Sequence, residues 1–132
     1  MGFSWRGEVF SKDVSVFLFD DNPLFLENLA FLLNRQNGIR VTGKTTSLEE
    51  ARQLTQKNPP EVVILGIGMF NKEGYYALLS FWQEQGIPVI VLGLDSKEGE
   101  EALRRGASAF FRKGESYPEL LATINKIGGE AS

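Results

Sequence analysis

The chain has 132 residues, a usual length for one domain, and 42% of them are hydrophobic while 23% are charged. This balance excludes an intrinsically disordered chain, and a formal net charge of −3 argues against a surface built to bind nucleic acid. The absence of cysteine and histidine from the sequence excludes disulfides, thiolate or imidazole metal sites, and histidine-dependent catalytic triads.

The first third of the chain predicts a strand, a helix and a second strand. Residues 14–19, VSVFLF, are apolar at almost every position, which is typical of a strand buried on both faces of a parallel sheet. Pro23 suits the first turn of a helix over residues 23–34, and Asn37-Gly38 ends that segment. Residues 39–44, IRVTGK, form a more polar strand that we place at the sheet edge.

The rest of the chain continues the same alternation. Ser47 and Glu50 have the spacing of a capping box, in which the two side chains each satisfy a free amide, and the helix ends before Asn58-Pro59-Pro60. The next elements are a strand over EVVILGI (61–67), a helix over YYALLSFWQEQ (75–85) and a strand over PVIVLGL (88–94). The last are a short helix within DSKEGEEALRRG (95–106), a strand over ASAFFRK (107–113) and a helix over LLATINKI (120–127), opened by Ser116 and closed by Gly128-Gly129.

Five strands that alternate with five helices predict an α/β domain with a five-stranded parallel sheet covered on both faces. We divide the chain into an apolar arm (1–13), one domain (14–127) and a tail or the start of a linker (128–132). In such sheets the functional groups lie at the carboxyl ends of the strands. Those ends carry Asp20-Asp21, Gly66-Ile67-Gly68, Gly93-Leu94-Asp95 and Lys113.

Asp20 and Asp21 are the most distinctive pair at this edge. Two carboxylates ~4 Å apart repel by ~4 kcal/mol at an effective dielectric constant of 20. A lysine such as Lys113 or a divalent cation would relieve that repulsion, and oxygen ligands select magnesium or calcium. The alternative is that both acids only cap the first helix.

Several segments resemble a known family. The strand followed by Asp20-Asp21-Asn22-Pro23-Leu24-Phe25, the capped second helix and the run that starts at Pro60-Glu61 resemble the receiver domain of bacterial response regulators. DDNPLF, GIRVTGKTTSLEEA and RRGASAFFRKG resemble the receivers of LuxR-type transcription regulators in particular. The resemblance runs from Val14 to Ile127 and implies a doubly wound (βα)5 flavodoxin-like fold with a role in two-component signal transduction.

The resemblance also implies a site. In that family an acidic pair binds magnesium, an aspartate that ends strand three accepts a phosphoryl group, and a lysine ends strand five. The acidic pair falls on Asp20 and Asp21, the lysine on Lys113, and the backbone carbonyl that completes the metal site on Gly68. The strand-five aromatic, whose rotation reports activation in the family, falls on Phe110.

Two positions depart from the family pattern. The phospho-acceptor position is Gly66 and the strand-four hydroxyl position is Gly93, so the nucleophile and the hydroxyl group are both missing. We therefore expect a receiver that does not run the aspartyl phosphorelay, with no catalytic residue and with weak magnesium binding at best. Lys113 then serves as a structural partner of the acids, and Phe110 is either uncoupled from phosphorylation or a plain core aromatic.

Apolar surfaces suggest protein partners. The helix over residues 23–34 is apolar nearly all round. Its expected core stripe consists of Phe25, Leu29, Leu32 and Leu33. Leu26 and Ala30 lie beside this stripe, and Phe31 lies on a further face. The helix over residues 75–85 carries the surplus aromatics Tyr75, Tyr76, Phe81 and Trp82. We expect the arm, which contains Phe3, Trp5, Val9 and Phe10, to cover the first helix in its own chain or in a homodimer. The alternative is an unstructured tail.

The leading hypothesis is an atypical receiver that regulates through protein contacts, as the regulatory part of a transcription regulator, without binding nucleic acid itself. The alternatives are phosphorylation or gating at a non-standard site such as Asp20 or Asp21, and a flavodoxin-like domain that binds a small ligand. We do not expect an enzyme, because an acidic first turn repels phosphate and no glycine-rich fingerprint or P-loop is present. No apolar run reaches the ~20 residues of a membrane span and no secretory signal opens the chain, so we expect a cytoplasmic protein.

Overall fold

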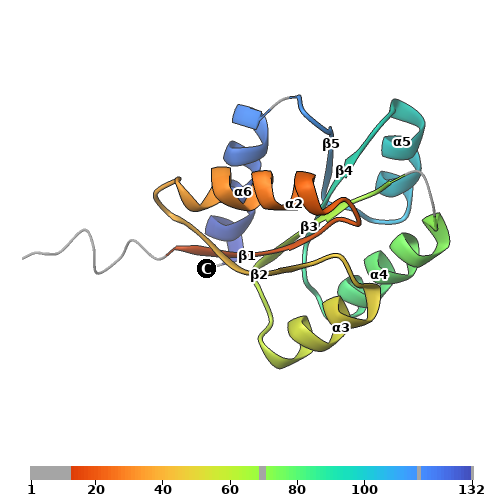
Figure 1. Ribbon diagram of the computed structural model, residues 1–132, viewed down its shortest axis with the longest axis horizontal. Helices are drawn as coiled ribbons and strands as arrows, with labels where there is room; N and C mark the ends of the chain where they lie inside the picture. Colours follow the sequence, from red (N-terminus) through yellow and green to blue (C-terminus); the bar gives the residue numbers. More distant parts are fainter. Residues whose placement is uncertain (1–12, 69–70, 116, 132) are drawn as a thin grey trace, which may run out of the picture.

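The computed structural model describes residues 13–68, 71–115 and 117–131, and within them strands and helices alternate along the chain (Figure 1). The strands are β1 (Val14–Phe19), β2 (Ile39–Thr45), β3 (Val62–Gly66), β4 (Val89–Gly93) and β5 (Ala109–Arg112). The helices are α2 (Pro23–Asn34), α3 (Leu48–Lys57), α4 (Lys72–Glu84), α5 (Ser96–Arg104) and α6 (Tyr117–Ala131). The apolar arm, apart from Asp13, lies outside the described residues.

The strands form one parallel sheet in the order β2-β1-β3-β4-β5, which confirms the predicted α/β architecture. The polar strand β2 is at an edge, as its composition predicts, and β5 is at the other edge. Every residue of β1, β3 and β4 is buried, because the inner strands of a parallel sheet are covered on both faces.

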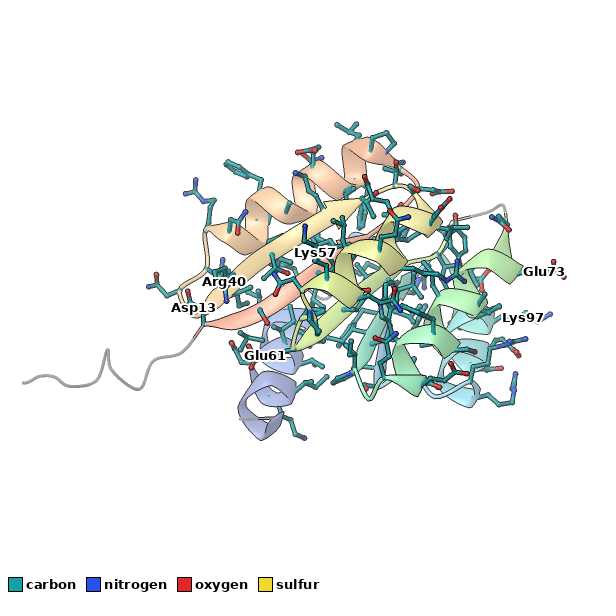
Figure 2. The ribbon with its side chains drawn as sticks, turned by 90° about the horizontal axis from the view of Figure 1, so that it is seen from below. Asp13, Arg40, Lys57, Glu61, Glu73 and Lys97 are labelled. Carbon is teal, nitrogen blue, oxygen red and sulfur yellow. The ribbon has the colours of Figure 1, made fainter. Side chains whose placement is uncertain are left out.

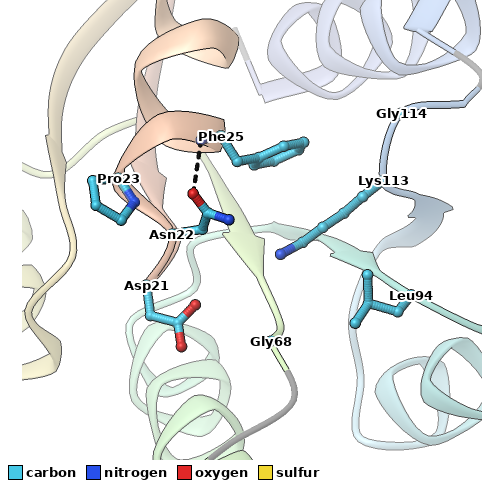
Figure 3. A pocket seen from close by; sticks show the side chains of 8 residues that line it. All are labelled: Asp21, Asn22, Pro23, Phe25, Gly68, Leu94, Lys113 and Gly114. Carbon is cyan, nitrogen blue, oxygen red and sulfur yellow. Dashed lines mark hydrogen bonds between the residues drawn. The ribbon is translucent and has the colours of Figure 1, made fainter.

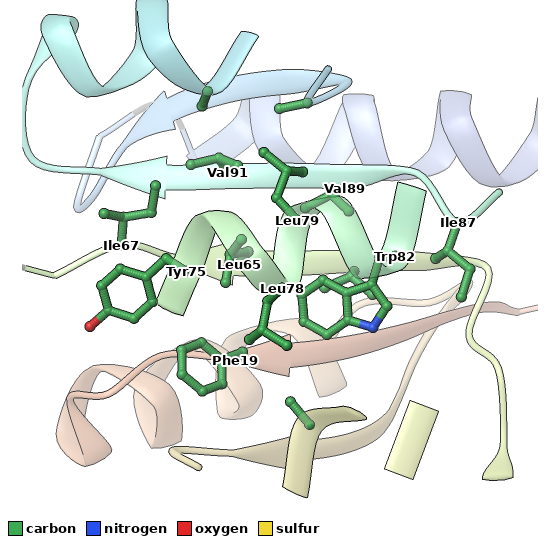
Figure 4. Close-up of a cluster of buried hydrophobic side chains, with 14 of the residues drawn as sticks. Phe19, Leu65, Ile67, Tyr75, Leu78, Leu79, Trp82, Ile87, Val89 and Val91 are labelled. Atoms are coloured by element: carbon green, nitrogen blue, oxygen red, sulfur yellow. The ribbon is translucent and has the colours of Figure 1, made fainter. Parts of the chain in front are cut away.

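Successive side chains of β1 point to opposite faces and so enter two different cores. Phe17 and Phe19 pack with residues of α3, α4 and α5, in the cluster drawn in Figure 4. Val16 and Leu18 pack with residues of α2 and α6 on the other face. Charged side chains such as those of Arg40, Lys57 and Lys97 extend from the surface (Figure 2).

The apolar stripe of α2 differs from its prediction. Leu26, Leu29, Ala30 and Leu33 are buried, Phe25 is half-buried, and Leu32 is 43% exposed. Leu29 and Leu33 are thus buried as predicted, but the helix is rotated about its axis from the expected orientation. Leu26 and Ala30 are buried in the core more deeply than Phe25 and Leu32. An almost uniformly apolar helix leaves its rotation undetermined, since its residues favour burial on every side.

In α4 the surplus aromatics divide into two kinds. Tyr75 and Trp82 are core residues, and the Trp82 indole N–H donates to the buried hydroxyl of Thr55 at 2.9 Å. Tyr76 and Phe81 pack on the rim of this core, where Arg105 lies 4.2 Å above the ring of Tyr76.

The predicted capping box of α3 is only half formed. The Ser47 hydroxyl accepts from the Glu50 amide at 3.1 Å, but the Glu50 carboxylate accepts from the Thr45 hydroxyl instead of from the Ser47 amide. Thr45, the last residue of β2, competes successfully because its own hydroxyl accepts from the Ser47 amide. A complete capping box occurs at α5, between Asp95 and Glu98.

Helix α6 continues through Gly128-Gly129 to Ala131, whereas the sequence predicted a stop there and a tail after it. A Cβ on Gly128 would lie 2.5 Å from a methyl carbon of Val14, so this glycine allows the helix to pass close to β1. The expected cap of this helix, Ser116, lies outside the described residues.

Candidate functional site

The candidate site lies at the edge of the sheet where the parallel strands end. Asp20 and Asp21 follow β1, Gly66 ends β3, Gly93 ends β4 and Lys113 follows β5. The structure therefore brings to one edge the residues that the family resemblance assigned to a site. A hollow of about 740 Å³ opens here, lined by Asp21, Asn22, Pro23, Phe25, Gly68, Leu94, Lys113 and Gly114 (Figure 3).

The loop after β1 gives the two acids different environments. Asn22 caps α2, because its side-chain oxygen accepts from the Leu24 and Phe25 amides, so neither acid is the cap. The Asp20 side chain turns inward and is 1% exposed, and its Oδ1 accepts from the Asn22 amide at 2.8 Å. Asp21 is exposed.

Asp20 forms a buried ion pair with Lys113. The lysine Nζ lies 2.7 Å from Asp20 Oδ2, and the ring of Phe25 covers the ammonium group with its centroid 5.0 Å away. Breaking a buried pair of this kind leaves one charge without a partner, so each residue requires the other. The pair joins the loop after β1 to the loop after β5, past the ends of β3 and β4, which lie between these strands in the sheet.

Asp20 also fills the space beside Gly66. A Cβ built on Gly66 would collide with the Asp20 carboxylate, so the first atom of any side chain at position 66 would need that space. The end of β3 is therefore occupied by the acid of the neighbouring strand.

Asp21 has a different internal partner, Tyr75. The Tyr75 hydroxyl donates to Asp21 Oδ2 at 2.5 Å, and the ring, 2% exposed, stands edge-on to Phe19. Burial first, and then the hydrogen bond to Asp21, raise the pKa of Tyr75 well above its usual value. A Cβ on Gly68 would lie 2.9 Å from Asp21 Oδ1 and 3.1 Å from the Tyr75 hydroxyl, so the three residues meet at one point.

Phe110 occupies the space beside Gly93. A Cβ on Gly93 would lie 2.7 Å from Cε1 of Phe110, and a Cβ on Gly99 of α5 would also collide with this ring. Phe110 is half-buried and packs on the α4–α5 core. The two glycines thus form the seat in which this ring lies.

Glu98 is a further charged group close to the end of β4. It is 5% exposed, its Oε1 accepts from the Leu94 amide at 2.6 Å, and its Oε2 lies 3.2 Å from the ammonium group of Lys72. Glu98 thereby connects the end of β4 with the start of α4. Its capping-box spacing from Asp95 could have revealed its position, but the ion pair with Lys72 has no signal in the sequence.

In the described part of the chain, no three or more acidic side chains gather in a way that could hold a metal ion. The acids that the resemblance assigned to magnesium instead contact protein groups, Lys113 in one case and Tyr75 in the other. In those same residues no helix has both the length and the apolar character needed to cross a membrane.

Comparison with known proteins finds one matching family model, the response regulator receiver domain, over residues 16–125. The chain is 28% identical over 116 residues to the transcriptional regulatory protein DesR of Bacillus subtilis, which covers 86% of this chain and 58% of that protein. It is 30% identical over 121 residues to a protein-glutamate methylesterase/protein-glutamine glutaminase of Methanococcoides burtonii, which covers 89% of this chain and 33% of that protein. The chain thus spans less than two thirds of either relative.

Solved structures show the same fold. The receiver domain of the Francisella response regulator 1452 superposes with a TM-score of 0.77 at 23% identity, over 91% of this chain and all 100% of that one. The response regulator domain of Thermotoga maritima CheB superposes with a TM-score of 0.73 at 25% identity, over 89% of this chain and 98% of that one.

Proposed function

Because the chain belongs to the response regulator receiver domain family of two-component signalling, we propose that it is an atypical receiver that signals through protein contacts without conventional aspartyl phosphorylation. One observation carries the proposal: the acceptor position is Gly66, and the buried Asp20 fills the space beside it. An aspartyl phosphate needs a carboxylate that a phosphoryl donor can reach. Asp20 is 1% exposed and paired with Lys113, so it does not present such an oxygen.

The remaining acid supports the same proposal. Asp21 is exposed, but one of its oxygens accepts from Tyr75 and the only lysine among the residues that line the hollow, Lys113, is paired with Asp20. Phosphoryl transfer relies on positive groups held against the transferred oxygens. Phosphorylation at Asp21 would therefore lack the charge that stabilises it.

The end of β4 also supports the proposal that no hydroxyl group couples a phosphoryl group to rotation of Phe110. Gly93 has no hydroxyl group to bind a phosphoryl oxygen, and the ring of Phe110 fills the space where a side chain at Gly93 would extend. The Phe110 ring therefore cannot respond to movement of a hydroxyl group at position 93. This arrangement favours a receiver with one resting conformation, in which Phe110 is a packing residue.

Partner binding by α2 is the second part of the proposal. Leu24 is 71% exposed and Phe31 is 61% exposed, an amount of apolar surface that suits a protein partner, including a second copy of this chain. The apolar arm of residues 1–13 is a candidate cover for this helix in a homodimer. The likeness to the transcriptional regulatory protein DesR supports a role as the regulatory part of a transcription regulator. We place that role in the cytoplasm and, because the net charge of −3 is unlike that of a nucleic-acid surface, expect no direct contact between these residues and nucleic acid.

Phosphoryl transfer from a small donor tests the proposal. The protein is incubated with acetyl phosphate and magnesium, and its intact mass is measured beside a receiver that ends strand three in aspartate. We expect the mass of one phosphoryl group to be added to the control receiver alone. Addition to this protein, mapped to Asp20 or Asp21 by trapping with hydroxylamine, would favour phosphorylation at a non-standard site.

A further inference from the structure

We propose that Tyr75 takes the place of the divalent cation at the acidic pair, so that the site is complete without a metal ion. Its hydroxyl donates to Asp21 at 2.5 Å, while Lys113 holds Asp20 at 2.7 Å. The inference deepens the proposed function and rests on it in one respect: a site that accepts no phosphoryl group needs no cation to receive one.

Separate protein groups balance the negative charges of Asp20 and Asp21. Adjacent carboxylates need a cation or separate positive or hydrogen-bonding partners. Asp20 contacts the Asn22 amide and Lys113, whereas Asp21 contacts Tyr75, so separate protein groups hold the two carboxylates in place of a shared ion. Magnesium demands oxygen ligands in a nearly octahedral arrangement, and an acid held by an ammonium group is not free to join one.

Packing in the core fixes the position of the Tyr75 hydroxyl. The Tyr75 ring is held in the core between Phe19 and Ile67, and its oxygen points out of that cluster (Figure 4). The hydroxyl therefore reaches Asp21 on a side chain that packing keeps in place. It meets Asp21 beside Gly68, whose carbonyl the family resemblance assigned to the metal.

The contact with Asp21 is specific to Tyr75. Tyr76, the next residue of α4, faces Arg105 on the outer surface instead of the acidic pair. A phenylalanine at position 75 would keep the ring packing and remove only the donor to Asp21. Removal of this donor leaves the carboxylate free to bind a cation.

Manganese serves as the probe, because it binds oxygen sites like those of magnesium and broadens nearby amide signals. The wild-type protein, Tyr75→Phe and the matched control Tyr76→Phe are titrated with manganese and followed by two-dimensional amide NMR. We expect no saturable broadening at Asp21 and Gly68 in the wild type and in Tyr76→Phe. In Tyr75→Phe we expect saturable broadening there, with an affinity at least about tenfold above the upper limit that the wild-type titration sets, because a charge-assisted hydrogen bond is worth about that factor.

Saturable manganese binding at Asp21 in the wild-type protein would overturn the inference. So would a folded Tyr75→Phe protein, verified by its dispersed spectrum, that binds manganese no better than the wild type. Neither outcome depends on phosphorylation. The acetyl phosphate measurement therefore judges the proposed function separately, since its readout is a covalent mass.

Discussion

The carboxylate of Asp20 lies where a side chain at Gly66 would begin. The two residues come from neighbouring strands, β1 and β3, and the absence of a side chain on one makes room for the acid of the other. Lys113 then pairs with Asp20 at 2.7 Å. A closed ion pair thus lies at the end of β3, beside the position that the family resemblance assigned to the phospho-acceptor.

Restoring the acid at position 66 should destabilise the fold. In Gly66→Asp the new Cβ collides with Asp20 and adds a second buried carboxylate, for which we expect a loss of about 3 kcal/mol or more in unfolding free energy. Urea denaturation measures this. Gly66→Ala carries the collision alone and should lose less, about 1–3 kcal/mol. A Gly66→Asp protein as stable as the wild type would show that Asp20 moves aside freely.

Removal of one member of the ion pair should cost more than removal of both. Lys113→Met leaves the Asp20 charge buried without a partner, which predicts a loss of about 3–5 kcal/mol. Asp20→Asn combined with Lys113→Met should recover part of that loss. Equal stabilities of the single and double variants in urea denaturation would argue that the pair is not coupled.

High pH should unfold the protein through its tyrosines. Burial raises the pKa of Tyr75, Tyr76 and Tyr117 above the ordinary value of about 10. As the pH rises above about 10 the unfolded chain loses these protons first, so stability is complete below that pH and falls above it. Ultraviolet absorbance should show tyrosinate appearing together with loss of structure. Ionisation of all three tyrosines at their ordinary pKa in the folded protein would contradict this.

Self-association through α2 is a further prediction. Phe31→Glu should weaken any dimer seen by analytical ultracentrifugation and leave the unfolding free energy within about 0.5 kcal/mol, because the side chain is 61% exposed. The control Leu54→Glu changes a side chain that is also exposed, on α3, which covers the other face of the sheet.

Deletion of residues 1–12 should cause association or loss of stability. An unchanged mass in solution and an unchanged melting point would contradict a role for the arm.

The sequence predicted the element order and the edge at which the site lies, because strand composition and loop chemistry are local properties. Asp20 and Asp21 directly follow β1 and Lys113 directly follows β5, so a parallel sheet must bring them to one edge. Lys113 forms an ion pair with Asp20, one of the two acids that we expected it to neutralise, and its purely structural role stays a prediction.

The residues that sequence reasoning missed act across the sheet or between helices. Tyr75 was visible only as a surplus aromatic, since its hydrogen bond to Asp21 joins residues 54 positions apart. Gly128 was read as a helix stop, yet it serves close packing against Val14. Neither role can be inferred from local composition, because each depends on what the folded chain places opposite the residue.

The measurement that tests the absence of aspartyl phosphorylation most directly is a two-dimensional NMR titration with magnesium and then beryllium fluoride, which mimics an aspartyl phosphate. We expect beryllium fluoride to leave the signals of Asp20, Phe110 and Lys113 unchanged. Coordinated movement of the Phe110 and Lys113 signals would instead mean that another carboxylate serves as the acceptor, and the proposed absence of phosphorylation would be wrong.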